Sequence, residues 1–128
     1  RFTAADVDTP TLTSSVPSNN ATGVAVGNDI VLTFSENIQA GTGNITLFDS
    51  ADTTIEAFDV TTDVTIVGGT VTLNPAADLA SSTTYYVQIA GSAIDDASGN
   101  SYVGISDKTT LRFTAADVDT PTLTSSVP

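Results

Sequence analysis

The stretch that decides the fold is VTIVGGTVTL, residues 64–73. Two alternating runs of apolar and polar residues flank a Gly-Gly pair, and glycine tolerates the positive φ angles of a two-residue turn, so the stretch predicts a β-hairpin. The turn also fixes the register, which sets Ile66 opposite Val71 and Val64 opposite Leu73. These side chains share one face of the hairpin, which we expect to lie in a core, while the intervening threonines face solvent.

The same alternation recurs on both sides of the hairpin. Short runs rich in Val, Ile, Thr and Phe are separated by Gly, Asn, Asp and Pro, and no helical period is sustained, which is typical of a sandwich or barrel. Further strands are expected at Thr11–Val16, Ile30–Phe34, Ile45–Leu47, Ile55–Val60 and Thr109–Thr114.

One more alternating run extends from Leu79 through Tyr85 to Ile89. It resembles the approach to the sixth strand of fibronectin-like and immunoglobulin-like sandwiches, where a tyrosine hydroxyl bonds back to upstream backbone. We therefore predict that Tyr85 is a corner tyrosine. Together these runs predict an all-β fold, an immunoglobulin-like β-sandwich of about seven strands with Greek-key topology.

The two ends of the sequence carry the same letters. Residues 1–17 read RFTAADVDTPTLTSSVP, and residues 112–128 read the same again. A repeat at domain spacing indicates a tandem array, which is usually built for length, multivalency or stiffness. The expected organisation is a linker from the preceding repeat at 1–9, one sandwich domain at 10–116, and a linker with the first strand of the next repeat at 117–128. Adjacent identical repeats in the same polypeptide are therefore the first expected partners.

The charge of the chain is strongly one-sided. It has 15 acidic residues against 3 basic ones, which gives a net charge of −12. Such a surface repels nucleic acid and anionic membranes and attracts divalent cations, which would relieve the self-repulsion of the array. No apolar run approaches the ~20 residues of a membrane span. We expect neither nucleic-acid binding nor direct membrane insertion.

The residue types used in nucleophilic catalysis are missing. The chain has no Cys, His, Met or Trp, which excludes disulfides, thiol chemistry and imidazole ligands and leaves no ordinary triad. A carboxylate pair such as Asp95 with Glu36 could in principle do glycosidase chemistry, but small sandwiches rarely enclose the cleft that it needs. We therefore predict that the protein is not an enzyme.

Acidic residues at the joint between repeats form the first candidate ion site. Asp6 and Asp8 flank one apolar residue, and the repeat gives Asp117 and Asp119 the same spacing. Residues i and i+2 of an extended chain point to the same side, so each pair can converge on one hard cation. The alternative is a solvated linker with two stray acids.

A second group of oxygen ligands is expected within the domain. Asp95 and Asp96 precede a turn that ends at Asn100, and Glu36 lies where the strand Ile30–Phe34 stops. A turn can bring side-chain and backbone oxygens together as calcium requires, although an ordinary polar turn explains the same residues. In a seven-stranded sandwich these connections lie where the first strand begins, so the topology gathers them with the first pair of linker acids at one pole. Calcium is the predicted cofactor.

The residues from Val7 to Ala116 resemble a known family. The segments DTPTLTSSVPSNNATGVAV, IVLTFSE, TYYVQI, IDDASGN and LRFT are together similar to bacterial immunoglobulin-like repeats, found in giant cell-surface adhesins of the repeats-in-toxin type and in surface-layer proteins. In that family the repeats are extender regions between a membrane-proximal anchor and distal ligand-binding domains, and calcium stiffens the joints. The resemblance implies an extracellular location on a bacterial cell surface, a role in adhesion and biofilm formation, and a distal ligand bound by other domains.

Two other functions fit the same residues. One is a binding module that recognises a glycan or a protein through its loops or an exposed sheet face, with the repeats providing avidity. The other is a flexible spacer that binds no ions.

Overall fold

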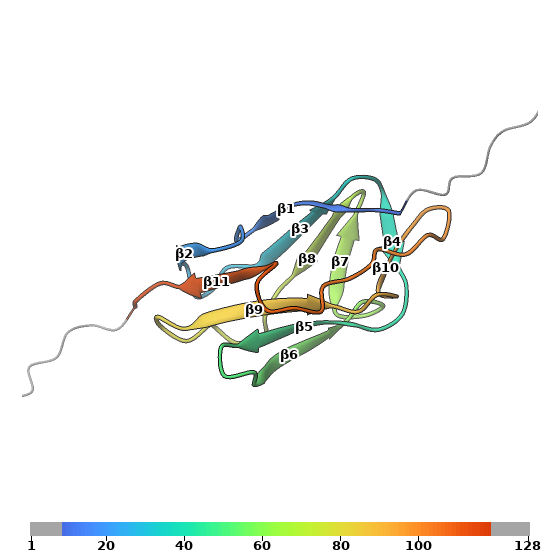
Figure 1. The fold of residues 1–128 in the computed structure, drawn as a ribbon. Helices are drawn as coiled ribbons and strands as arrows, with labels where there is room; N and C mark the ends of the chain where they lie inside the picture. The colour runs from blue at the N-terminus through green and yellow to red at the C-terminus, as the bar shows by residue number, and fades with distance from the viewer. Residues whose placement is uncertain (1–8, 119–128) are drawn as a thin grey trace, which may run out of the picture.

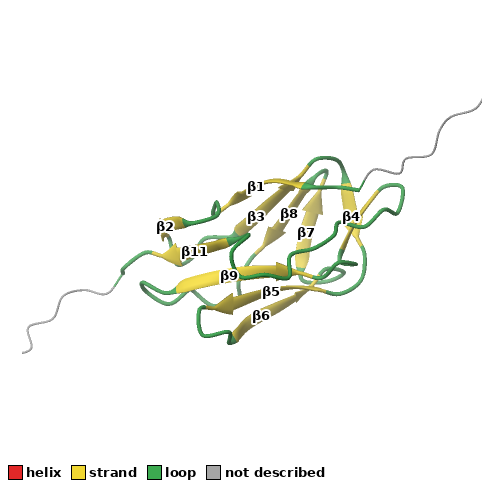
Figure 2. Cartoon of the chain, viewed as in Figure 1, coloured by secondary structure: helices red, strands yellow, loops and turns green. Residues whose placement is uncertain are grey.

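The structure is a computed structural model, and it describes residues 9–118 of the chain. In this part the chain forms strands joined by turns and loops, with no helix (Figures 1 and 2). The strands are β1 Leu12–Val16, β2 Ala21–Val24, β3 Ile30–Phe34, β4 Ile38–Ala40, β5 Asn44–Asp49, β6 Thr54–Asp59, β7 Val64–Val67, β8 Thr70–Leu73, β9 Thr84–Ile89, β10 Ile94–Asp96 and β11 Arg112–Ala115. The predicted all-β class is confirmed.

Two sheets form the sandwich. The first has the strand order β1-β3-β8-β7 and the second the order β2-β11-β9-β5-β6, while β10 and β4 make a separate two-stranded pair. The N-terminal part of the domain crosses between the sheets, because β1 belongs to one and β2 to the other. Strand β2 pairs with β11 in parallel. This order is that of an immunoglobulin-like sandwich, as the sequence predicted.

The hairpin β7–β8 has the predicted register, with Ile66 opposite Val71 and Val64 opposite Leu73. The turn differs slightly from the expectation. Gly68 takes a positive φ of 59°, whereas Gly69 is needed because a side chain at this position would have no space. A Cβ on Gly69 would lie 2.9 Å from the backbone oxygen of Glu36. The hairpin turn is therefore packed against the end of β3.

The core lies between the two larger sheets and contains the alternate apolar side chains of their strands. Its largest fully buried members are Phe58, Phe113, Ile30, Leu32, Ile45, Leu47, Leu73, Ile94, Leu111, Val60, Val71 and Val87. Tyr85 is also buried, and the backbone N–H of Ala80 donates a hydrogen bond of 2.7 Å to its hydroxyl. The predicted corner tyrosine is confirmed.

Three short strands lie where the sequence predicted none. They are β2, β4 and β10. Strand β10 lies in what we expected to be a long irregular connection, and it pairs with β4, from which it is separated by more than fifty residues in sequence. Such short strands carry too little alternation to be recognised alone, since their pairing depends on distant partners.

The described chain begins and ends at opposite ends of the sandwich (Figure 1). The first described residues lie at the end of the sandwich where β1 begins, and the last lie beyond the end of β11. The long axis of the domain therefore runs from its N-terminal to its C-terminal side.

Candidate functional site: the two poles of the sandwich

We define the leading pole as the end of the sandwich formed by residues 9–12, 35–38 and 95–100. Here the start of the first strand is fixed to the end of β3. The N–H of Ser35 donates to the carbonyl of Thr11 at 2.8 Å, and the N–H of Thr11 donates to Ser35 Oγ at 3.0 Å. The β4–β10 pairing sets Ile38 opposite Asp96 and so joins the 35–38 segment to the 96–100 turn.

Asp96 is the buried charged residue of this pole, and its side chain organises its own turn. One carboxylate oxygen accepts hydrogen bonds from the N–H groups of Ser98 at 2.9 Å and Asn100 at 2.8 Å. The other accepts from the Asn100 side-chain amide at 3.0 Å. Gly99 completes the turn with a φ of 91°. Asp96 and Asn100, both predicted as calcium ligands, therefore have a structural role in shaping this turn.

Asp95 and Glu36 lie at the same pole. Asp95 alternates with Asp96 along β10, so their side chains point to opposite faces, and its carboxylate accepts a hydrogen bond from Ser101 Oγ at 2.5 Å. Glu36 is half-buried beside the hairpin turn. Within residues 9–118 no group of three or more acidic side chains closes on one metal position. Asp6 and Asp8, which the sequence analysis adds to this pole, lie outside the described residues.

We define the trailing pole as the opposite end, formed by residues 79–83 and 116–118. There the C-terminal segment is held by Ser81. Its hydroxyl donates to Asp117 Oδ1 at 3.2 Å and accepts from the N–H of Val118 at 2.8 Å. The N–H of Ser82 donates to the carbonyl of Ala116 at 3.1 Å. Asp117 thus contacts the domain that precedes it in the chain, while Asp119 lies outside the described residues.

Carboxylates in the turns of the domain are held ionised by local hydrogen bonds. The side chain and then the backbone N–H of Thr61 lower the pKa of Asp59. The N–H and then the hydroxyl of Thr110 lower the pKa of Asp107, with a further contribution from the N–H of Thr109. Part of the negative charge of the chain therefore belongs to turn carboxylates whose ionised form is stabilised by hydrogen bonds.

The fold and the sequence together match one family. The bacterial Ig-like domain matches residues 6–115, which is most of the chain and includes every strand described above. The chain belongs to the bacterial Ig-like domain family. Domains of this family are typically extracellular or exposed at the surface, as structural or binding modules, and they are generally not enzymes.

A solved structure supports the fold of this bacterial Ig-like domain. The crystal structure of CopC from Methylosinus trichosporium OB3b superposes with a TM-score of 0.64 over 88% of this chain and 99% of that one, at 17% sequence identity. At this identity the likeness shows the fold alone. No curated protein matches the sequence. Among the described residues there is no helix long and apolar enough to cross a membrane.

Sequence reasoning missed the serine that holds the C-terminal segment. Ser81 is one of many serines and threonines in the chain, and nothing in its neighbours marks it, because its partners are more than thirty residues away. The structural role of Asp96 did have a signal. An aspartate followed by Ala-Ser-Gly-Asn is the pattern of a side chain that hydrogen-bonds to its own turn.

Proposed function

We propose that this bacterial Ig-like domain is a structural extender module of a bacterial surface adhesin of the repeats-in-toxin type. Its tandem copies are made rigid by calcium bound between consecutive domains, and the array projects distal ligand-binding domains from the cell surface. The observation that carries the proposal is the placement of the two chain ends at opposite poles, because a domain of this kind adds its full length to an array (Figure 1).

Because the sequence repeats, this one chain contains the residues of both sides of a joint. Residues 112–118 give the C-terminal side of the joint, and residues 9–17 give the N-terminal side of the next copy. Only Asp119, the copy of Asp8, lies between them in sequence. Because one residue advances the chain by at most ~3.8 Å, consecutive poles are expected to lie close together.

The two poles supply different oxygen ligands to an ion at such a joint. Asp117 is exposed and already positioned by Ser81 at the trailing pole. Glu36 and Asp95 belong to the leading pole of the next domain. Since no acidic group of the described domain forms a metal site by itself, the proposed ion uses oxygens from both poles and from Asp119. Asp6 and Asp8 have the same roles at the preceding joint.

Calcium would stiffen the array through linkage. An ion that bridges two poles binds the ordered joint better than the flexible one, and it therefore shifts the population towards the extended form. Extracellular calcium modules bind with Kd values of about 10⁻⁴–10⁻³ M. At calcium concentrations one hundred times Kd, the bound joint gains about 2.7 kcal/mol.

The test uses a protein of two complete repeats in calcium and in chelator. We expect a larger radius of gyration by small-angle X-ray scattering, and a higher melting temperature, in calcium. Asp119→Asn at the central joint should remove both effects. Glu56→Gln, which removes one charge from the middle of β6, is the matched control and should retain them. Equal radii in calcium and chelator would reject the calcium mechanism and favour a flexible spacer.

A further inference from the structure

A small pocket on the outer face of the five-stranded sheet brings together the cations of the described chain. We call it the side pocket; it holds about 80 Å³ and is lined by Ser50, Thr84, Tyr86, Lys108 and Arg112. The remaining basic residue of the sequence, Arg1, lies outside the described part. In a chain of net charge −12, both described cations thus line one pocket.

The sheet register positions one side of the side pocket. Arg112 on β11 lies opposite Tyr86 on β9, and Tyr86 lies opposite Phe48 on β5. Directly opposed residues share a face of the sheet, so these side chains form a row across three strands. The Tyr86 ring stacks on Phe48 with 4.9 Å between centroids. Arg112 therefore projects from a rigid strand beside a fixed aromatic pair.

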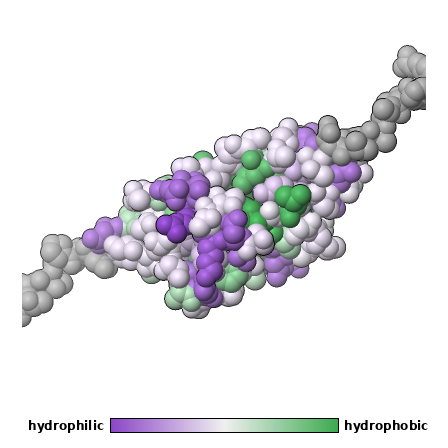
Figure 3. Space-filling view, in the orientation of Figure 1, coloured by the Kyte–Doolittle hydropathy of each residue, from purple (hydrophilic) through white to green (hydrophobic). Residues whose placement is uncertain are grey.

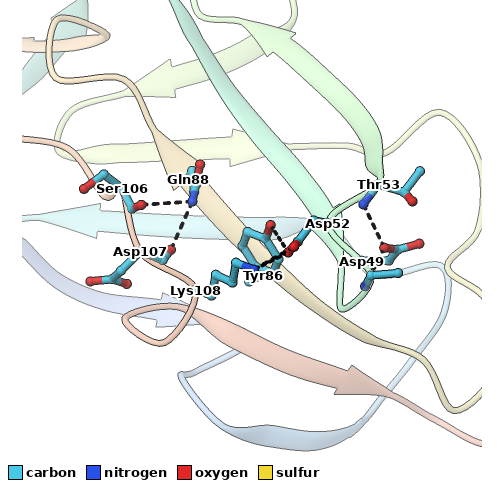
Figure 4. Close-up of polar contacts among 9 residues, drawn as sticks. Asp49, Asp52, Thr53, Tyr86, Gln88, Ser106, Asp107 and Lys108 are labelled. Carbon is cyan, nitrogen blue, oxygen red and sulfur yellow. Dashed lines mark hydrogen bonds and ion pairs between the residues drawn. The ribbon is translucent and has the colours of Figure 1, made fainter.

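Lys108 is held in place on the other side of the side pocket (Figure 4). Its Nζ lies 2.6 Å from Asp52 Oδ1 and 2.7 Å from Oδ2, and the Tyr86 hydroxyl donates to Asp52 at 2.8 Å. The side-chain amide of Gln88 donates to the carbonyl of Ser106 at 3.1 Å and so fixes the loop that carries Lys108. The Lys108 ammonium lowers the pKa of Asp52 most, followed by the Tyr86 hydroxyl.

The charges at the side pocket do not cancel. The five residues that line it include two cations and no carboxylate, and one of the cations, Lys108, pairs with Asp52 beside the pocket. The other ionised side chains of the described domain are acidic. An anion is repelled elsewhere on this surface and is attracted here, and the fork of an arginine matches the two oxygens of a carboxylate.

A shallow groove of about 340 Å³ lies along the same sheet face. Its polar lining consists of Asn44, Thr46, Gln88 and Ser106, and Val103, 79% exposed, supplies apolar surface. Gln88 is two residues after Tyr86 on β9, so both side chains are on the outer face. Figure 3 shows strongly hydrophilic and apolar areas side by side on this view of the molecule. Amides and hydroxyls are suited to the hydroxyl groups of a sugar ring.

We propose that this face binds an acidic saccharide of the uronic acid class, with the sugar carboxylate in the side pocket and the ring hydroxyls in the neighbouring groove. One such site per repeat binds weakly, and an array of repeats multiplies the affinity through avidity. The proposal is independent of calcium at the joints and adds a binding role to a spacer.

The test is a titration of the present chain with sodium glucuronate, followed by ¹⁵N–¹H NMR in chelator. We expect saturable shifts at the amides of Ser50, Thr84 and Arg112, together with Thr46 and Gln88. Glucose and acetate should each bind at least about tenfold more weakly, because glucose lacks the carboxylate and acetate lacks the ring hydroxyls.

Arg112→Gln should weaken glucuronate binding about tenfold or more, as expected for the loss of a bidentate charged contact. Arg1→Gln is the matched control, because it removes the same charge from the first copy of the same local sequence, and it should bind normally. Equal binding by the two variants, or equal shifts with acetate and glucuronate, would overturn the proposal. Ligand-free shifts at these residues that depend on protein concentration would also overturn it, since acids of a second copy would then occupy the pocket.

Discussion

The leading and trailing poles hold their chain segments in opposite ways. At the leading pole a buried carboxylate, Asp96, accepts three hydrogen bonds from its own turn. At the trailing pole the hydroxyl of a half-buried serine, Ser81, holds the backbone and side chain of a segment that leaves the domain. The first arrangement belongs to the folded domain itself, and its removal is expected to lower the stability of the domain strongly. The second contributes little to stability and sets how the chain departs, so the poles can be altered separately.

The largest effect is expected at the leading pole. Asp96→Ala should lower the free energy of unfolding by about 2–4 kcal/mol, because it removes the buried carboxylate and leaves the part-buried N–H donors of the 96–100 turn without that acceptor. Urea denaturation of the single repeat measures this loss. The neighbouring Asp95→Ala removes the same charge from a half-buried position and should cost less than about 1 kcal/mol. A similar cost for both would contradict the distinction between them.

The next effect concerns the support of the trailing pole. Tyr85→Phe removes the hydroxyl that accepts from Ala80 and should cost about 1–2 kcal/mol of stability. Tyr102→Phe is the control, since Tyr102 is equally buried and no hydrogen bond of its hydroxyl is seen among the described residues; it should cost less than about 0.5 kcal/mol. Thermal unfolding of both variants distinguishes the corner bond from general packing.

A smaller effect on stability is expected at Ser81, which holds the C-terminal segment. Ser81→Ala should change the unfolding free energy by less than about 0.5 kcal/mol. It should nevertheless lower the ¹⁵N order parameters of Asp117 and Val118 from rigid values near 0.85 towards 0.6, because their anchor is lost. Ser14→Ala, on the exposed face of β1, should leave them unchanged. Unaltered order parameters in Ser81→Ala would show that Ser81 does not hold the segment.

The smallest effect distinguishes a hydrogen bond from a charged donor, Lys108, from hydrogen bonds from a neutral donor, Thr61, near the two ends of β6. The pKa of Asp52 is lowered mainly by Lys108, whereas the pKa of Asp59 is lowered by Thr61. A folded-state pKa below the unfolded value of ~3.9 means that each ionised carboxylate stabilises the fold above that pH, and the stabilisation is lost as pH falls through the folded-state pKa.

Carboxyl titrations by NMR at low and high salt test this difference. Salt should move the pKa of Asp52 towards its ordinary value and leave that of Asp59 nearly unchanged, because salt screens charges more than it weakens hydrogen bonds. Equal salt responses would contradict the assigned causes.

The parts of the fold that depend on local pattern were predictable. The hairpin register from Val64 to Leu73 and the corner bond of Tyr85 follow from alternation and spacing within a few residues. Strands β4 and β10 could not be predicted, because each exists only through pairing with the other. The fold places Glu36, Asp95 and Asp96 at the same end of the sandwich as the start of β1, but within residues 9–118 no group of three acidic side chains closes on one position, so the predicted ion site stays a prediction.

The chemistry of the candidate sites was less accessible. An acidic residue in a turn looks the same whether it faces an ion or caps its own backbone, and burial distinguishes Asp96 only once the fold is known. Lys108 and Arg112 are four residues apart in an irregular stretch, and only the register of β11 against β9 shows that both reach one pocket. Calcium binding at the joints remains a prediction.

The parallel pairing of β2 with β11 has a mechanical consequence. In the proposed array, tension would act on the domain from both ends, so that β2 would be drawn towards the leading pole and β11 the other way. Hydrogen bonds from Asn20 to Arg112 and from Ala116 to Val24 then lie across the pulling direction and bear load together in shear, rather than opening one after another. Because forced unfolding is governed by the unfolding rate, this geometry favours a domain that yields slowly under tension.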